Sequence, residues 1–275
     1  MASRAEQKAA ARKAREAKQQ ELHAAATRRQ RLLWLGGIVG VAVIALVVVV
    51  IASSNGGGGS GPVHHTNSQT ATAVAAVNQE LHGIPQSGNT LGNPKAPVTI
   101  TEYGDLVCPT CDDFALTSEP QIIDSLVRTG TAKLVFRGLE TASATANGSQ
   151  YVNTQVAARS AGLQGKAWDY ITLMYQLQPQ TINGTPAEQV AYITPAYLQN
   201  IAAHVKGLNL AKWQAHMTDQ KLINQVKADT TAAVQSGAAS RGTPTVFVTG
   251  PNGTAVDPET VPSLATVSQL VQQES

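Results

Sequence analysis

A run of 21 residues without a charged side chain, from 32 to 52, limits the fold of this chain more than any other feature. An α-helix rises about 1.5 Å per residue, so this run would cover roughly 31 Å, the thickness of a bilayer core. Lipid offers the backbone no hydrogen-bond partner, and a helix satisfies its own backbone. Core helices rarely stay apolar on every side over this length, and the apolar part of a cleaved signal peptide usually has about 7–15 residues. We therefore expect an uncleaved transmembrane helix, a signal-anchor, over 32–52, with a cleaved signal peptide as the alternative.

Charge is distributed unequally around this run. Residues 1–31 hold nine basic and three acidic side chains, a net charge of +6, whereas residues 32–275 hold 11 basic and 15 acidic side chains, a net charge of −4. Basic residues mark the cytoplasmic side of a membrane protein. The sequence thus predicts a cytoplasmic basic tail over 1–31 and an extracytoplasmic region from 53 onward, in a single-pass protein of the cell membrane. Such a tail is a common topology signal, so no nucleic-acid partner is predicted.

The region after the predicted span begins with a linker. Residues 53–62 read SSNGGGGSGP, which is typical of a flexible tether. A short helix is expected over 67–81, and we group 53–82 as linker and short helix. Residues 84–97 are rich in Gly, Pro and Asn, so the chain there is expected to be extended or to turn.

Residues 83–273 have the pattern of an α/β domain. Strands are indicated by β-branched and aromatic runs, and helices by apolar residues at helical spacing. The predicted elements, in chain order, are a strand over 98–103, a helix over 112–128 with a kink at Pro120, a strand over 133–137, helical segments from 151 to about 225, a strand over 245–249, a turn over 250–253, a fourth strand from 255, and a last helix over 261–273.

The chain has two cysteines, Cys108 and Cys111, and they stand where the first predicted strand gives way to a helix. Two cysteines exclude a disulfide-dense scaffold and a four-thiolate zinc site. Pro109 suits the first turn of a helix, where its missing N–H costs nothing. Cys108 would then lie at the helix start and face solvent, where free N–H groups and the helix dipole stabilise a thiolate. Cys111 falls one turn further on the same face, so one sulfur can attack a substrate disulfide and the other can resolve the mixed disulfide.

A purely stabilising disulfide and half of a zinc site are the alternatives for this pair. A bridge that closes so short a loop restrains little chain entropy. No second pair of ligands accompanies the cysteines, so no metal site is predicted. The pair is therefore expected to be a redox-active disulfide that requires no further cofactor.

In this region the sequence resembles the thioredoxin superfamily, and within it the membrane-anchored, DsbA-like thiol-disulfide oxidoreductases. The resemblance rests on three motifs: Cys-Pro-x-Cys after a strand in PVTITEYGDLVCPTCD (97–112), the sequence RGTPT (241–245), which looks like the cis-proline loop of that family, and GLQGKAW (162–168), which is similar to part of its helical insertion. It covers about residues 83–273. It implies a thioredoxin-like α/β fold with an inserted helical domain at about 145–240.

The resemblance also implies roles for residues around the pair. Pro244, in a cis peptide bond, would lie against Cys108 and Cys111 and line the groove that holds substrate backbone. Thr243 would offer backbone groups to an extended peptide and its hydroxyl to the sulfur. Glu102 matches a buried acid of the family that accepts the proton of Cys111, and burial would raise its pKa toward that task. The alternative for Glu102 is an ordinary strand carboxylate that faces water.

Net redox direction stays open at this point. Strongly oxidising members of the family have a histidine between the cysteines, whereas this chain has Pro109 and Thr110, and a threonine hydroxyl is the weaker donor. The resemblance implies an enzyme that exchanges its disulfide with thiols of secreted or membrane proteins, and we expect it to act as an oxidase in protein folding. It also implies a quinone-linked membrane reoxidant of the DsbB or vitamin K epoxide reductase type. An anchored reductase or isomerase, or a non-catalytic thioredoxin-fold binding module, are the alternatives.

Overall fold

The structure is a computed structural model that describes residues 65–144, 149–179 and 192–275. The predicted tail over 1–31 and the predicted transmembrane helix over 32–52 lie outside these ranges. Within them, no helix combines the length and the apolar character that crossing a bilayer requires.

The strands of the described part form one mixed sheet, in the order β1-β2-β4-β3-β5-β6. They are β1 (Gln86–Ser87), β2 (Thr90–Leu91), β3 (Val98–Gly104), β4 (Ala132–Gly138), β5 (Thr245–Gly250) and β6 (Gly253–Val256). β3 is central: it runs parallel to β4 on one side and antiparallel to β5 on the other. Because parallel neighbours need a crossover connection, the chain between β3 and β4 is helical.

The long strands lie where the sequence predicts them. Leu134 and Phe136 of β4, with Ile100 of β3, are buried in the main core, as the β-branched and aromatic runs indicate. The hairpin of β5 and β6 closes through the predicted turn. The short hairpin of β1 and β2 lies in the segment expected only to be extended or turning, because a two-residue strand shows no alternating pattern.

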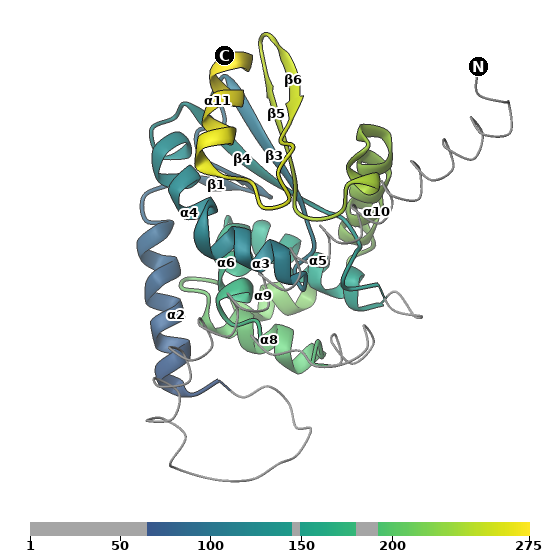
Figure 1. The fold of residues 1–275 in the computed structure, drawn as a ribbon. Helices are drawn as coiled ribbons and strands as arrows, with labels where there is room; N and C mark the ends of the chain where they lie inside the picture. The colour runs from purple at the N-terminus through teal and green to yellow at the C-terminus, as the bar shows by residue number, and fades with distance from the viewer. Residues whose placement is uncertain (1–64, 145–148, 180–191) are drawn as a thin grey trace, which may run out of the picture. The chain divides into compact units, whose positions relative to one another are not determined.

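The helices cover the sheet and fill the segment between β4 and β5. Their bounds are α2 (Asn67–Glu80), α3 (Pro109–Thr117), α4 (Glu119–Ile122), a π-helical turn η1 (Ile123–Val127), α5 (Ser149–Gly162), α6 (Ala167–Gln176), α8 (Pro195–His204), α9 (Leu210–Ala215), α10 (Gln220–Ser236), the 3-10 turn η2 (Ala238–Ser240) and α11 (Leu264–Glu274). Figure 1 shows the sheet in the upper part of the view and α6, α8 and α9 gathered below it.

The helix predicted over 112–128 is broken into three pieces, α3, α4 and η1. The first break falls at Ser118, two residues before Pro120. Proline has no N–H to donate and its ring crowds the preceding turn, so the predicted kink at this position is confirmed. The break turns the chain so that Glu119 is buried whereas Gln121 is exposed.

The helix grouped with the linker shares the main core. Ala73 and Val77 of α2 are buried there, and α2 packs against α6. α6 is buried over nearly its whole length, and the indole N–H of its Trp168 donates to the Asn89 carbonyl in the hairpin of β1 and β2. α6 also packs against α3, and this contact supports the segment that carries the two cysteines.

Candidate active site

Cys108 caps the amino end of α3. β3 ends at Gly104, and the extended backbone of Cys108 (φ −78°, ψ 124°) makes it the residue before the first helical turn. Pro109 occupies that turn, because a residue there needs no N–H. Cys108 is 7% exposed, so the prediction that it faces solvent is wrong. The loop at Thr243 lies against it, and the Thr243 carbonyl oxygen is 3.6 Å from its Sγ atom.

The surroundings of Cys108 favour its thiolate. The Cys111 thiol hydrogen bonds to the Cys108 sulfur, which is the largest of the effects that lower the pKa of Cys108 from its ordinary 9.0 to about 5. Burial acts in the opposite direction, whereas the Thr243 side chain and the backbone N–H groups of Thr110 and Cys111 lower the pKa further. These N–H groups are free because they belong to the first turn of α3. At neutral pH, Cys108 is thus the nucleophilic sulfur of the pair.

Cys111 has the opposite character. It has no exposed surface, and burial raises the pKa of its thiol well above 9.0; the hydrogen bond to Cys108 adds to this. Both cysteines are free thiols in the structure. Two neighbouring groups whose pKa values are pushed apart take different parts in a reaction. Cys108 can attack, and Cys111 holds its proton until a base removes it.

The loop that precedes β5 lies beside the pair. The Thr243–Pro244 peptide bond is cis, as the resemblance implies. The Thr243 hydroxyl lies 2.6 Å from the Thr141 hydroxyl, which ties this loop to the one after β4. Thr245 pairs with Tyr103 across β5 and β3. This pairing brings Pro244 next to the segment that leads to Cys108.

Glu102 lies beneath the pair, on β3. It is 1% exposed, so the alternative of a carboxylate that faces water is wrong. Burial is the largest effect that raises its pKa from 4.5 to about 7, and the charge of Cys108 raises it further. The charge of Glu102 in turn raises the pKa of Cys111. A carboxyl group with a pKa near neutrality can both take and give a proton at physiological pH.

Asp105 is a site residue that the sequence does not predict. It is fully buried, and one carboxylate oxygen accepts four hydrogen bonds, from the backbone N–H and the hydroxyl of both Thr141 and Ser143. Its other oxygen accepts from the Val107 N–H. Because Thr141 also contacts Thr243, one carboxylate connects the segment before Cys108, the loop after β4 and the cis-proline loop. A charged residue directly after a buried strand is the only signal of this role in the sequence.

The remaining predicted site residues lie at the start of α3, where Pro109 is exposed and Thr110 is half-buried. The structure therefore brings the other five predicted site residues around the Cys108–Cys111 pair. It adds Asp105 and a second buried acid, Glu119, which hydrogen bonds to Glu102. Within the described ranges, no three His, Cys, Asp or Glu side chains gather in an arrangement that could hold a metal ion.

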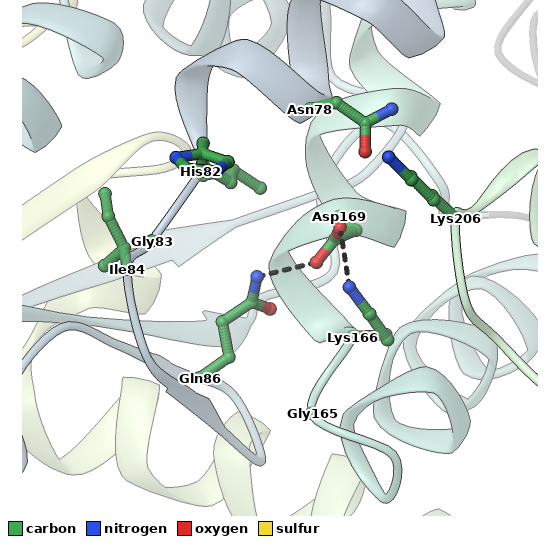
Figure 2. Close-up of a pocket in the computed structure, with 10 residues that line it drawn as sticks. Asn78, His82, Gly83, Ile84, Gln86, Gly165, Lys166, Asp169 and Lys206 are labelled. Atoms are coloured by element: carbon green, nitrogen blue, oxygen red, sulfur yellow. Dashed lines mark hydrogen bonds and ion pairs between the residues drawn. The ribbon is translucent and has the colours of Figure 1, made fainter.

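A separate polar pocket of about 280 Å³ lies where α2 ends and α6 begins, and none of its lining residues is a predicted site residue. Figure 2 shows Asp169 at its centre, with one oxygen directed to Gln86 and the other to Lys166. Asp169 is 6% exposed; Lys166 balances its charge, and the Gln86 amide donates a hydrogen bond to it. These two contacts hold the start of α6 to β1, and the carboxylate of Asp169 in this pocket is therefore paired.

A sheet of this order, in which a Cys-Pro-x-Cys helix start lies against a cis-proline loop, has a thioredoxin-like fold with a helical insertion between β4 and β5, as in DsbA-like structures. The family model described as thioredoxin matches residues 86–266, and the chain belongs to this family.

Solved structures support the same fold. BdbD from Bacillus subtilis, in its oxidised form, aligns with a TM-score of 0.56 at 20% identity, over 69% of this chain and 95% of that one. DsbA from Chlamydia trachomatis aligns with a TM-score of 0.53 at 19% identity, over 67% of this chain and 90% of that one. At these identities the likeness concerns the fold.

Curated relatives are similar in sequence over more than half of this chain. Disulfide bond formation protein D of Bacillus subtilis is 23% identical over 170 residues, 58% of this chain and 66% of that protein. The Na⁺/H⁺ antiporter NhaA 3 of Salinispora tropica is 28% identical over 166 residues, 60% of this chain. The match spans only 22% of the antiporter's length, so its activity is not carried over to this chain.

Proposed function

We propose that this chain is a membrane-anchored oxidase that works outside the cytoplasm and transfers the Cys108–Cys111 disulfide to thiols of secreted or membrane proteins. The low pKa of Cys108 beside a buried Cys111 carries the proposal, because a stabilised thiolate makes the dithiol form stable and the disulfide a good oxidant. The apolar run over 32–52 and the basic residues before it support the anchor and its orientation. The name of the Bacillus subtilis relative, a disulfide bond formation protein, agrees with this direction.

The exchange would take two attacks. A substrate thiolate attacks Cys108, the S–S bond to Cys111 breaks, and Cys111 leaves with a proton supplied by Glu102. A second substrate thiolate then attacks the substrate sulfur of the mixed disulfide and releases Cys108 as a thiolate. The substrate loses two electrons, which the protein's dithiol gains. A quinone-linked membrane partner of the DsbB or vitamin K epoxide reductase type would accept these electrons and restore the disulfide.

The loop residues would hold the substrate for these steps. The backbone of Thr243 would pair with an extended substrate segment, and Pro244 would form the floor of the groove beside Cys108. Pro109 fixes the start of α3, and Thr110 presents a neutral hydroxyl near the sulfur. That hydroxyl, where strongly oxidising relatives have histidine, favours the second candidate function, an anchored reductase or isomerase.

The reduction potential of the Cys108–Cys111 pair separates the oxidase from an anchored reductase. The full-length chain, purified in mild detergent, is equilibrated with glutathione buffers and its thiols are trapped with acid and alkylated. A potential of about −120 to −180 mV, the range of known disulfide oxidants and isomerases, is expected. A potential of about −270 mV or lower, as in thioredoxin, would refute the oxidase and direct the search to a membrane electron donor.

A further inference from the structure

Cys111 needs a route for its proton. It has no exposed surface, yet its thiol must gain or lose a proton each time the disulfide opens or closes. Its neighbour Glu102 is 1% exposed and has no direct access to water either. A single buried acid can take this proton once, but it must pass the proton on before the next cycle. The groups behind Glu102 therefore decide how the proton reaches solvent.

Glu119 is the group directly behind Glu102. It is the first residue of α4 and is 1% exposed. Among the described residues, no other group donates a hydrogen bond to either carboxyl oxygen of Glu102 or to Oε1 of Glu119. The two carboxyl groups hydrogen bond to each other. Two carboxyl groups in such contact cannot both ionise, so the pair holds one proton and one charge.

Glu80 continues this row of acids toward the surface. It is the last residue of α2 and is half-buried, and its Oε1 atom is covered and has no partner within the described ranges. Burial and then the charge of Glu119 raise the pKa of Glu80 to about 8, whereas the charge of Arg128 lowers it. The Arg128 guanidinium donates to the backbone carbonyls of Glu80 and His82, which fixes this helix end.

The geometry points to a proton relay in which Glu119 is a positioning residue that exchanges protons with Glu102, and Glu80 connects the buried pair to solvent. When the disulfide opens, Cys111 takes the proton of Glu102, which is replaced from Glu119, then Glu80, then water. When the disulfide closes, each proton moves in the reverse direction, and the buried Glu102–Glu119 pair again holds one proton and one charge.

The other titratable groups that face this row come from neighbouring elements. Tyr175 of α6, whose hydroxyl donates to the Asp105 carbonyl, is influenced by the charges of Glu102 and Glu119, and burial raises its pKa well above 10.0. It stays neutral in the physiological range and contributes no charge to the relay. Asp105 is held by its own five donors. Within the row, burial raises the pKa of Glu102, Glu119 and Glu80 above the ordinary carboxyl value.

The test measures the step that needs the relay, and it rests on the exchange activity proposed above. The reduced full-length chain is mixed with oxidised glutathione, and the glutathione adduct of Cys108 is followed by acid quench and mass spectrometry. Loss of the adduct reports the attack by Cys111, which requires deprotonation. Rates are measured across the neutral pH range in H₂O and D₂O. A wild-type chain that forms no adduct at all would refute the exchange function itself, separately from the relay.

Four variants give the expected pattern. E102Q removes the first base and should slow adduct loss at neutral pH by about 100-fold, the lower range for general base catalysis. E119Q keeps a hydrogen-bond donor to Glu102 but cannot hold the proton, and should slow the step by about tenfold with an increased solvent isotope effect. E80Q, at the half-buried end of α2, should show the same increase in isotope effect. D113N, an exposed acid on α3, is the matched control and should behave as wild type.

The relay would be overturned if E102Q is slow while E119Q and E80Q keep wild-type rates and isotope effects. Glu102 would then exchange its proton by another route. If E119Q does not fold, E80Q and the infrared band of the protonated carboxyl decide the matter. Reduction of the wild-type chain should shift that band, and E102Q should abolish the shift. A band that does not respond to reduction would contradict the shared proton.

Discussion

The hydrogen bond from Cys111 to Cys108 gives a quantitative prediction. Replacing Cys111 by alanine removes the donor that contributes most to the low pKa of Cys108. A hydrogen bond to a charged acceptor contributes about 1.5–3 kcal/mol, and one pKa unit corresponds to about 1.36 kcal/mol. The pKa of Cys108 should therefore rise from about 5 by about one to two pH units.

Thiolate absorbance in the ultraviolet and the rate of alkylation by iodoacetamide both report this titration. Cys111→Ser is the matched control, because its hydroxyl keeps a donor at nearly the same place, and its midpoint should stay near that of the wild-type chain. The wild-type curve must be recorded on the reduced protein. An unchanged midpoint in Cys111→Ala would refute the reasoning and assign the stabilisation to the helix start and Thr243.

Three further outcomes follow from the geometry. Because the folded pKa of Cys108 lies below its ordinary 9.0, the thiolate stabilises the reduced fold fully above about pH 9, and this stabilisation disappears as the pH falls through about 5. The urea midpoints of the wild-type chain and of Cys108→Ser should therefore converge at acid pH and diverge toward alkaline pH. Asp105→Asn replaces a buried acceptor of five hydrogen bonds and should cost about 3 kcal/mol, measured by urea unfolding; a loss below about 1 kcal/mol would contradict the connecting role. Gly104→Ala places a Cβ atom 2.6 Å from the Phe136 ring and should destabilise the fold by about 1–3 kcal/mol, so an unchanged melting temperature would show that the ring can move.

The sequence predicts the elements that are determined by residues close to one another in the chain. The strands around Ile100 and Leu134 follow from β-branched runs, and the kink follows from Pro120. The helix start at the Cys-Pro-x-Cys motif can be predicted because Pro109 and the free N–H groups belong to the same turn. The cis bond at Pro244 comes from the family resemblance, since the spacing of residues alone does not require it.

The parts that the sequence does not predict depend on contacts between distant segments. Cys108 is covered because the loop at Thr243 folds back over it, and no pattern near residue 108 indicates this. The sequence pattern around Glu119 is that of an exposed acid on a helix. In the structure, the break after α3 buries this side chain beside Glu102. The connection through Asp105 likewise exists only once the loops after β3 and β4 meet.

The complete burial of Cys111 has a practical consequence for anyone who counts thiols in this protein. An alkylating reagent added to the folded, fully reduced chain should modify Cys108 alone, because Cys108 keeps 7% of its surface exposed and has the lower pKa, and the same reagent should modify both sulfurs after unfolding. A stoichiometry of one is then the signature of native dithiol protein rather than of a half-oxidised mixture. Redox states in a cell extract are therefore read correctly only when the chain is denatured before it is labelled.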